Sequence, residues 1–276
     1  MYKRRSFRLT IAALAVAVLG IGVVSFPAGA TPPSDVRPHG GSSPKPTVVL
    51  VHGAFADSSG WSLVAPALQA EGYPVLAFPN PLRGLQYDSE YLRRFLDTIA
   101  GPIVLVGHSY GGAVITNAAT GDPDVKSLVY VAAYALDEGE TVQDANTLGG
   151  GQSDLGANLV IRPFPGASEG DADAYIDVRA FRSIFAQDVP RPLAAVMAAS
   201  QRPAALAAFG TPSGVPAWKT IPSWYIVAKQ DRTIPPVAER AMASRAGSRT
   251  VEVNSSHVPM ISKPLSVLSV IRQAAR

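Results

Sequence analysis

Short apolar segments alternate along this chain with longer segments in which apolar residues recur every three or four positions. The short segments are rich in β-branched residues and apolar on both faces, which is typical of buried strands. The pattern predicts six strands, at residues 47–51, 74–78, 103–106, 127–133, 224–228 and 250–253. The longer segments have the spacing of amphipathic helices. They cover residues 61–70, 89–99, 236–245 and 264–274, with a further helix that ends near residue 119.

Strands that are apolar on both faces and alternate with helices predict one parallel sheet covered on both sides. The uneven connections favour an open, doubly wound sheet over an eightfold barrel. The alternation stops between about residues 135 and 221, where Gly149-Gly150-Gly151 is followed by helix-like spacing at 174–185 and 193–199. This stretch is too long for a loop. Because ligands bind beyond the carboxyl ends of such strands, we expect a helical cap over the site there, rather than a packed subdomain without a role in it.

The N-terminus has the pattern of an export signal over residues 1–30. Lys3-Arg4-Arg5 precedes an apolar run, and Ala28-Gly29-Ala30 provides a small-residue cleavage site. The paired arginines also fit a twin-arginine signal. The apolar run is short for a bilayer span, so we expect cleavage rather than an uncleaved anchor, and no stable membrane insertion afterwards. Residues 31–46 are rich in Pro, Gly and Ser and predict a flexible tether. The folded domain is then expected over residues 47–276, in a protein that is secreted or held in the cell envelope.

Composition and charge exclude several functions. The 276 residues are 47% hydrophobic and 16% charged, which is a globular composition. The net charge of +3 comes largely from Lys3, Arg4, Arg5 and Arg8 in the predicted signal, so no basic patch favours nucleic acid. The chain has no cysteine, which excludes disulfides, a cysteine nucleophile and thiolate metal sites.

One motif indicates chemistry. Gly107-His108-Ser109-Tyr110-Gly111 matches G-x-S-x-G and lies between a predicted strand and a predicted helix. A sharp strand-to-helix turn exposes the serine hydroxyl, and the helix dipole there favours a developing negative charge. The motif therefore predicts Ser109 as a nucleophile. The alternative is a serine that only caps the helix after a glycine turn.

A serine hydroxyl needs a neighbouring base to act as a nucleophile. The chain has four histidines. His39 lies in the predicted tether, His52 ends the first strand, and His108 precedes the serine and should point away from it. His257 remains, in the loop after the last strand, and is the predicted base.

A carboxylate must orient that base and stabilise its charge. Asp231 follows the fifth predicted strand, and the chain order serine, aspartate, histidine is that of hydrolases with this kind of nucleophile turn. Asp137 and Glu138, just after the fourth strand, are the alternatives. Asp231 could also merely cap the following helix or pair with Arg232.

A tetrahedral intermediate also needs two preorganised N–H donors. The sequence predicts the backbone amide of Tyr110, directly after the nucleophile, as one of them. The second should come from the loop after the first strand, where the amide of Ala54 is preferred over that of Phe55.

Together these segments resemble the α/β-hydrolase superfamily, and within it the compact branch of plant methyl esterases and hydroxynitrile lyases. The resemblance covers about residues 47–274, and its motifs are Val49-Leu50-Val51-His52-Gly53-Ala54-Phe55, Gly107-His108-Ser109-Tyr110-Gly111-Gly112, Asp231-Arg232-Thr233-Ile234-Pro235 and Ser256-His257. It implies a mostly parallel sheet of six to eight strands, a helical cap, no cofactor and an acyl-enzyme mechanism. It supports the roles given to Ser109, Asp231, His257 and the amides of Ala54 and Tyr110.

The chain departs from two other enzyme classes of this superfamily, and both departures argue against the corresponding activities. Hydroxynitrile lyases carry a lysine beside the catalytic histidine, whereas Val258 follows His257 here. Haloalkane dehalogenases of this fold use an aspartate nucleophile, which Ser109 excludes.

The sequence thus predicts a secreted serine hydrolase of a small or medium apolar ester or lactone, with no metal. Apolar residues that could line its pocket are Phe181, Phe185, Met197, Phe209, Trp218 and Trp224. The alternatives are a cofactor-free perhydrolase or haloperoxidase-like enzyme that uses the same triad, and a non-catalytic ligand-binding protein of the same fold.

Overall fold

The computed structural model describes residues 44–276. The predicted export signal at residues 1–30 and the predicted tether up to residue 43 lie outside the described residues.

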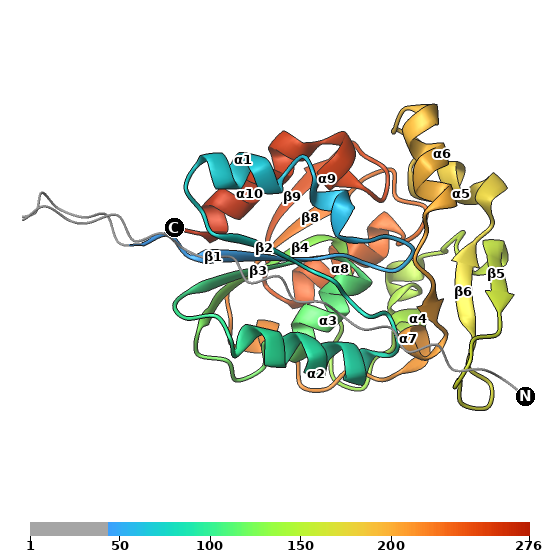
Figure 1. Ribbon diagram of the computed structural model, residues 1–276, viewed down its shortest axis with the longest axis horizontal. Helices are drawn as coiled ribbons and strands as arrows, with labels where there is room; N and C mark the ends of the chain where they lie inside the picture. The colour runs from blue at the N-terminus through green and yellow to red at the C-terminus, as the bar shows by residue number, and fades with distance from the viewer. Residues whose placement is uncertain (1–43) are drawn as a thin grey trace, which may run out of the picture. The chain divides into compact units, whose positions relative to one another are not determined.

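A six-stranded sheet forms the centre of the described part (Figure 1). Its order is β2-β1-β3-β4-β8-β9, and every neighbouring pair is parallel. The strands are β1 (Thr47–Val51), β2 (Val75–Phe78), β3 (Ile103–Ser109), β4 (Val125–Ala133), β8 (Ser223–Ala228) and β9 (Arg249–Val253). All six predicted strands are present. β3 extends as far as Ser109 because residues 107–109 still pair with β4.

Helices cover both faces of this sheet. Figure 1 shows α1 and α10 on one face and α2 and α3 on the other. The bounds are α1 (Ala65–Ala70), α2 (Leu85–Leu96), α3 (Tyr110–Ala118), α8 (Pro236–Arg245), α9 (Pro259–Ser262) and α10 (Pro264–Ala274). The predicted helix at residues 61–70 is shorter than expected, because Pro66 is tolerated only in the first turn; a separate 3-10 turn, Ser58–Trp61, precedes it.

The segment between β4 and β8 lies beyond the carboxyl ends of the strands, at the right of Figure 1. Besides helices it contains a small antiparallel sheet, β5-β6-β7. Its elements are α4 (Val142–Ala145), β5 (Leu159–Arg162), β6 (Asp173–Ile176), α5 (Val178–Phe185), α6 (Arg191–Ala199), β7 (Ala204–Ala205) and α7 (Ala207–Gly210). We call residues 135–221 the cap.

The cap corrects one expectation, since residues 174–185 were predicted as a single helix. Residues 173–176 instead form β6, in which buried and half-buried positions alternate with period two. Asp177 then ends the strand and caps α5 by accepting a hydrogen bond from the amide of Arg179 at 2.9 Å.

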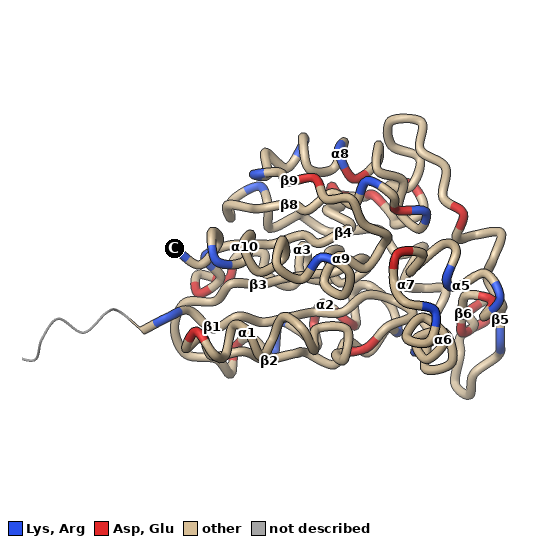
Figure 2. Tube along the Cα trace, turned by 90° about the horizontal axis from the view of Figure 1, so that it is seen from above, with Lys and Arg blue, Asp and Glu red and all other residues tan. Residues whose placement is uncertain are grey.

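Acidic and basic residues are interspersed over the described part rather than gathered by sign (Figure 2). Among residues 44–276 no helix is long and apolar enough to cross a membrane. The same residues contain no group of His, Asp and Glu side chains that could hold a metal ion.

Candidate active site

The turn from β3 into α3 holds Ser109 in a strained conformation. Its φ of +53° and ψ of −127° lie in a region that residues with a side chain rarely adopt. The flanking glycines allow the backbone to approach this closely. A Cβ atom at Gly107 would lie 2.6 Å from the carbonyl oxygen of Gly111, and one at Gly111 would lie 2.6 Å from that of Val51. The G-x-S-x-G spacing therefore reflects backbone contacts on both sides of the serine.

The structure brings Ser109, His257 and Asp231 together from three separate loops and turns. Oγ of Ser109 lies 2.8 Å from Nε2 of His257, and Nδ1 of His257 lies 2.5 Å from Oδ2 of Asp231. The side chains of His257 and Asp231 are fully buried, and Ser109 is 4% exposed. With the histidine neutral, its Nδ1–H donates to the carboxylate and its Nε2 accepts from the serine hydroxyl. This arrangement can remove the serine proton during attack on a carbonyl carbon.

Backbone amides fix the carboxylate of Asp231. Its Oδ1 accepts hydrogen bonds from the amides of Thr233 at 2.7 Å and Ile234 at 2.9 Å. The same side chain therefore caps the turn that leads into α8 and contacts His257. No pair with Arg232 forms, because the guanidinium of Arg232 lies 2.6 Å from Asp154.

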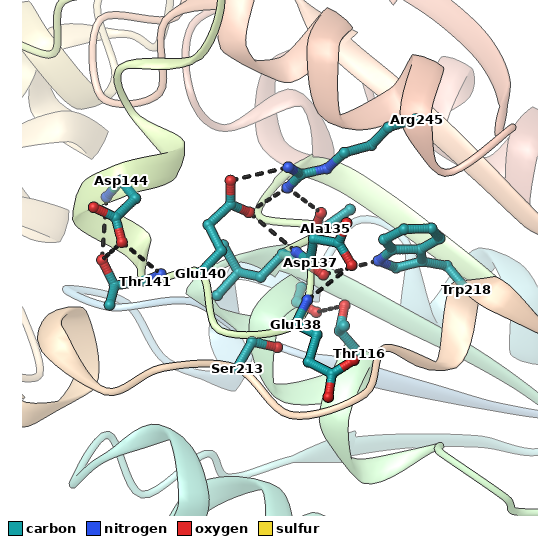
Figure 3. A network of polar contacts seen from close by, with 12 residues as sticks. Thr116, Ala135, Asp137, Glu138, Glu140, Thr141, Asp144, Ser213, Trp218 and Arg245 are labelled. Carbon is teal, nitrogen blue, oxygen red and sulfur yellow. Dashed lines mark hydrogen bonds and ion pairs between the residues drawn. The ribbon is translucent and has the colours of Figure 1, made fainter.

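The alternative acids lie in a different network (Figure 3). Asp137 is half-exposed and pairs with Lys219 at 3.0 Å, and this lysine holds the pKa of Asp137 below its usual range. Glu138 is exposed. Neighbouring Glu140 binds Arg245, which joins the loop after β4 to the C-terminal end of α8. The structure therefore does not bring Asp137 or Glu138 to His257.

The loop after β1 lies directly beside Ser109. A Cβ atom at Gly53 would lie 2.5 Å from Cβ and 3.1 Å from Oγ of Ser109. Ala54 follows, and among residues 44–276 no backbone carbonyl accepts from its amide. Tyr110 is the first residue of α3, so its amide has no acceptor within the helix. Both predicted donors thus remain available, and their role in binding an oxyanion stays a prediction.

We expect Gly53→Ala to lower kcat about 100-fold, the usual cost of displacing reacting groups by about an ångström. The added methyl group cannot coexist with the present position of Ser109, so either the loop or the nucleophile must shift. Gly210→Ala is the matched control, because a Cβ atom there would meet no atom within 4 Å. Steady-state kinetics of the two purified variants check this; equal activity would contradict the contact.

His108 has a position that the sequence did not reveal. As expected it points away from the serine, but its Nε2–H donates to the backbone carbonyl of His257 at 2.8 Å. Its ring packs edge-on against Trp61 and Phe185. Burial, followed by the proximity of His257, lowers the pKa of His108 well below its usual value, so it stays neutral. The sequence carries no signal for this bond, which joins segments far apart in the chain.

His52 is also neutral, and it contacts the loop after β1. Burial lowers its pKa to about 4. Its Nδ1 lies 2.9 Å from the carbonyl oxygen of Gly53, and Asn80 donates a side-chain N–H to the carbonyl of His52 at 3.1 Å.

Asp88 was missed because it precedes the helix predicted at residues 89–99, whereas α2 begins at Leu85 and holds Asp88 in its first turn. Its buried carboxylate accepts the hydroxyl of Tyr110 at 2.7 Å and the amides of Arg83 at 3.0 Å and Gly84 at 3.3 Å. Burial raises the pKa of this carboxyl above its usual value. The hydrogen bond from the Tyr110 hydroxyl to Asp88 fixes the side chain of Tyr110, whose backbone amide is a predicted oxyanion donor.

Two largely apolar cavities lie near the site, one between the cap and the loops after β1 and β9, and one within the cap. One, of about 250 Å³, is lined by Phe55, Phe185 and Val258 among others, and the ring of Phe185 lies 4.8 Å from that of His257. The other, of about 370 Å³, is lined by Phe209 among others. Phe209 packs on Phe55 and on Tyr110, with ring centroids 6.0 and 6.3 Å apart.

The sequence predicted six apolar residues as the possible pocket wall, and the structure places three of them at these cavities. Phe185, Met197 and Phe209 line these cavities. Phe181 is instead buried against Phe185. The tryptophans line neither cavity: Trp218 donates to the carbonyl of Leu136 at 2.9 Å, and Trp224 belongs to β8.

Residues 48–269 match the alpha/beta hydrolase family, so the chain belongs to this family and is a hydrolase. It is 28% identical over 249 residues to a pyrethroid hydrolase of Sphingobium wenxiniae, covering 83% of this chain and 87% of that protein. It is 24% identical over 254 residues to methylesterase 17 of Arabidopsis thaliana, covering 83% and 91%. A crystal structure of a pyrethroid hydrolase from Sphingobium faniae matches with a TM-score of 0.70 at 25% identity, over 83% of this chain and 97% of that chain. The fold class and the resemblance to the plant methylesterase branch are thereby confirmed.

Proposed function

We propose that this protein is an exported serine hydrolase that cleaves carboxylic esters through an acyl-enzyme. Ser109 is the nucleophile, His257 the general base and Asp231 the acid that orients it. The observation that carries this proposal is the buried hydrogen-bond chain from Ser109 through His257 to Asp231 behind a strained strand-to-helix turn.

In the first half-reaction, Oγ of Ser109 attacks the ester carbonyl carbon while Nε2 of His257 takes its proton. The carboxylate of Asp231 stabilises the resulting imidazolium, and the amides of Ala54 and Tyr110 bind the oxyanion. The bond between carbon and the alcohol oxygen then breaks, and His257 gives its proton to the departing alcohol. The acyl group remains on Ser109.

In the second half-reaction, a water molecule gives a proton to His257 and attacks the acyl carbon. The bond from that carbon to Oγ of Ser109 breaks, and the proton returns to the serine. The products are the carboxylic acid and the free enzyme.

The largely apolar wall of the cavity beside His257 favours a small or medium apolar ester or lactone. The cavity of about 250 Å³ that Phe185 shares with the triad is close to the lower end of the roughly 300–1,000 Å³ of ordinary small-molecule sites. The relatives named as a pyrethroid hydrolase and a methylesterase support an ester as the substrate class.

Covalent labelling tests this proposal. A fluorophosphonate should modify the wild-type protein, and peptide mapping should place the adduct on Ser109. A panel of nitrophenyl esters of increasing acyl length, set beside lactones, should show the highest kcat/KM at small or medium apolar acyl groups. The N-terminus of the secreted protein should be Thr31. Failure of the wild-type protein to react with the fluorophosphonate would favour a ligand-binding role for the same fold.

A further inference from the structure

A buried carboxyl group lies behind the triad and has no part in the mechanism above. Glu239 is on α8 and is 0% exposed. Its Oε2 accepts the amide of Ala228 at 3.1 Å. Its Oε1 is buried, and no N–H or O–H group among residues 44–276 donates to it. The bond to Ala228 places this carboxyl beside the turn that holds Asp231, because the carbonyl of Ala228 accepts the amide of Asp231 at 3.1 Å. The charge of Asp231 acts on Glu239 there.

The cation that faces Glu239 is already paired with another carboxylate. Besides Asp231, the titratable groups that face Glu239 are the phenols of Tyr134 and Tyr225 and the guanidinium of Arg240. Both phenols donate to other acceptors. The guanidinium of Arg240 binds both oxygens of the exposed Glu252 on β9, at 2.7 and 2.8 Å. Two ionised carboxylates in contact at such a site would repel each other strongly.

Hydrogen bonding decides which of the two carboxyls holds a proton. Asp231 accepts three N–H groups, from His257, Thr233 and Ile234, whereas Glu239 accepts one. Donors stabilise the ionised form, so the negative charge belongs on Asp231 and the proton on Glu239. In agreement with this, burial and then the charge of Asp231 raise the pKa of Glu239 well above its usual value.

We propose that Glu239 is a positioning residue of the triad. As a neutral carboxylic acid, it donates an O–H hydrogen bond to the carboxylate of Asp231 and holds that carboxylate against His257. The inference rests on the proposed function, because it assigns Glu239 a role in presenting the catalytic acid. It also implies that alkaline pH disturbs the triad, since loss of this proton would leave two carboxylates in contact.

A pair of variants separates the hydrogen bond from mere packing. Glu239→Met keeps a similar volume but has no donor, so kcat and the rate of fluorophosphonate labelling should fall about tenfold or more, the cost of one hydrogen bond to a charged group. The KM for a nitrophenyl ester should change little. Glu239→Gln retains both an N–H donor for Asp231 and an acceptor for Ala228, and should recover most of the lost rate. Equal rates in the two variants would overturn the proposal.

The pH profile provides a readout that a merely structural role would not move. The folded pKa of Glu239 is raised, so its contribution to stability is complete below the unfolded pKa and is lost as pH rises through the folded pKa. The melting temperature of the wild type should therefore fall relative to that of Glu239→Gln as the pH increases. The alkaline fall in labelling rate should also be absent or displaced upward in the glutamine variant. If the labelling rates of the wild type and of Glu239→Gln fell over the same alkaline pH range, the inference would be contradicted.

Infrared spectroscopy tests the wild type directly, even if a variant does not fold. At neutral pH the difference spectrum between the wild type and Glu239→Gln should contain the carbonyl band of a protonated carboxylic acid, and this band should shift in D2O. If the variant does not fold, the wild type can be titrated alone, and the band should disappear at alkaline pH. Glu140→Gln is the matched control, because it breaks the ion pair with Arg245 at the other end of the same helix (Figure 3) and should leave kcat and the band unchanged. Absence of the band would overturn the role of Glu239. Absence of labelling in the wild type would instead reject the proposed function.

Discussion

Ser109→Ala should lower kcat for ester hydrolysis by about a millionfold, as removal of a serine nucleophile does in related chemistry. Without Oγ no acyl-enzyme can form, and only substrate binding and the backbone donors remain to assist water. Fluorophosphonate labelling should disappear as well. The fold should be retained, because the hydroxyl makes one hydrogen bond, to His257, and alanine fits within the same turn.

Ser127→Ala is a suitable control for this experiment. Ser127 is also buried, at 1% exposed, and its hydroxyl donates to the carbonyl of Ala274 far along the chain. Its loss should cost about 1 kcal/mol of unfolding free energy, the typical net value of one hydrogen bond, while kcat stays close to that of the wild type. Substantial ester hydrolysis by purified Ser109→Ala would reject Ser109 as the nucleophile.

Asp231→Asn should lower kcat about 10⁴-fold, as the equivalent change does in other triads. The new amide oxygen can still accept from Thr233 and Ile234, which leaves its NH2 group facing Nδ1 of His257. The imidazole would then carry its proton on Nε2 and could no longer accept one from Ser109. The effect should appear in kcat rather than in KM, because the geometry of the pocket is preserved.

The matched control here is Asp137→Asn, which removes the pair with Lys219 and leaves the triad intact. It should have kcat close to that of the wild type. If Asp231→Asn kept near-normal activity while Asp137→Asn lost it, the assignment of the acid would be wrong. Circular dichroism and melting temperatures of both proteins would show that the comparison concerns folded enzymes.

Features that depend on neighbouring residues could be predicted from the sequence. The six strands follow from short β-branched runs, and the nucleophile turn follows from glycines two positions either side of Ser109. The cap was harder, because β6 and α5 meet at Asp177 without a glycine or proline between them. A pattern of period two over four residues is too short to separate from a helix.

Contacts between distant segments carried no signal in the sequence. The bond from His108 to the carbonyl of His257 and the bond from Tyr110 to Asp88 each depend on how strands and helices pack. The burial of Glu239 beside the turn that holds Asp231 likewise depends on how α8 packs against β8. Such partners are found only when side-chain positions are known.

The order of the sheet has a consequence for the newly made chain. β8 and β9 leave the ribosome after the other four strands of the described sheet, and β9 pairs with β8 at its edge. Asp231 follows one of these strands and His257 the other, whereas Ser109 emerges much earlier. A polypeptide still under synthesis therefore holds Ser109 without its proposed base, and we expect ester hydrolysis to begin only after β9 has docked.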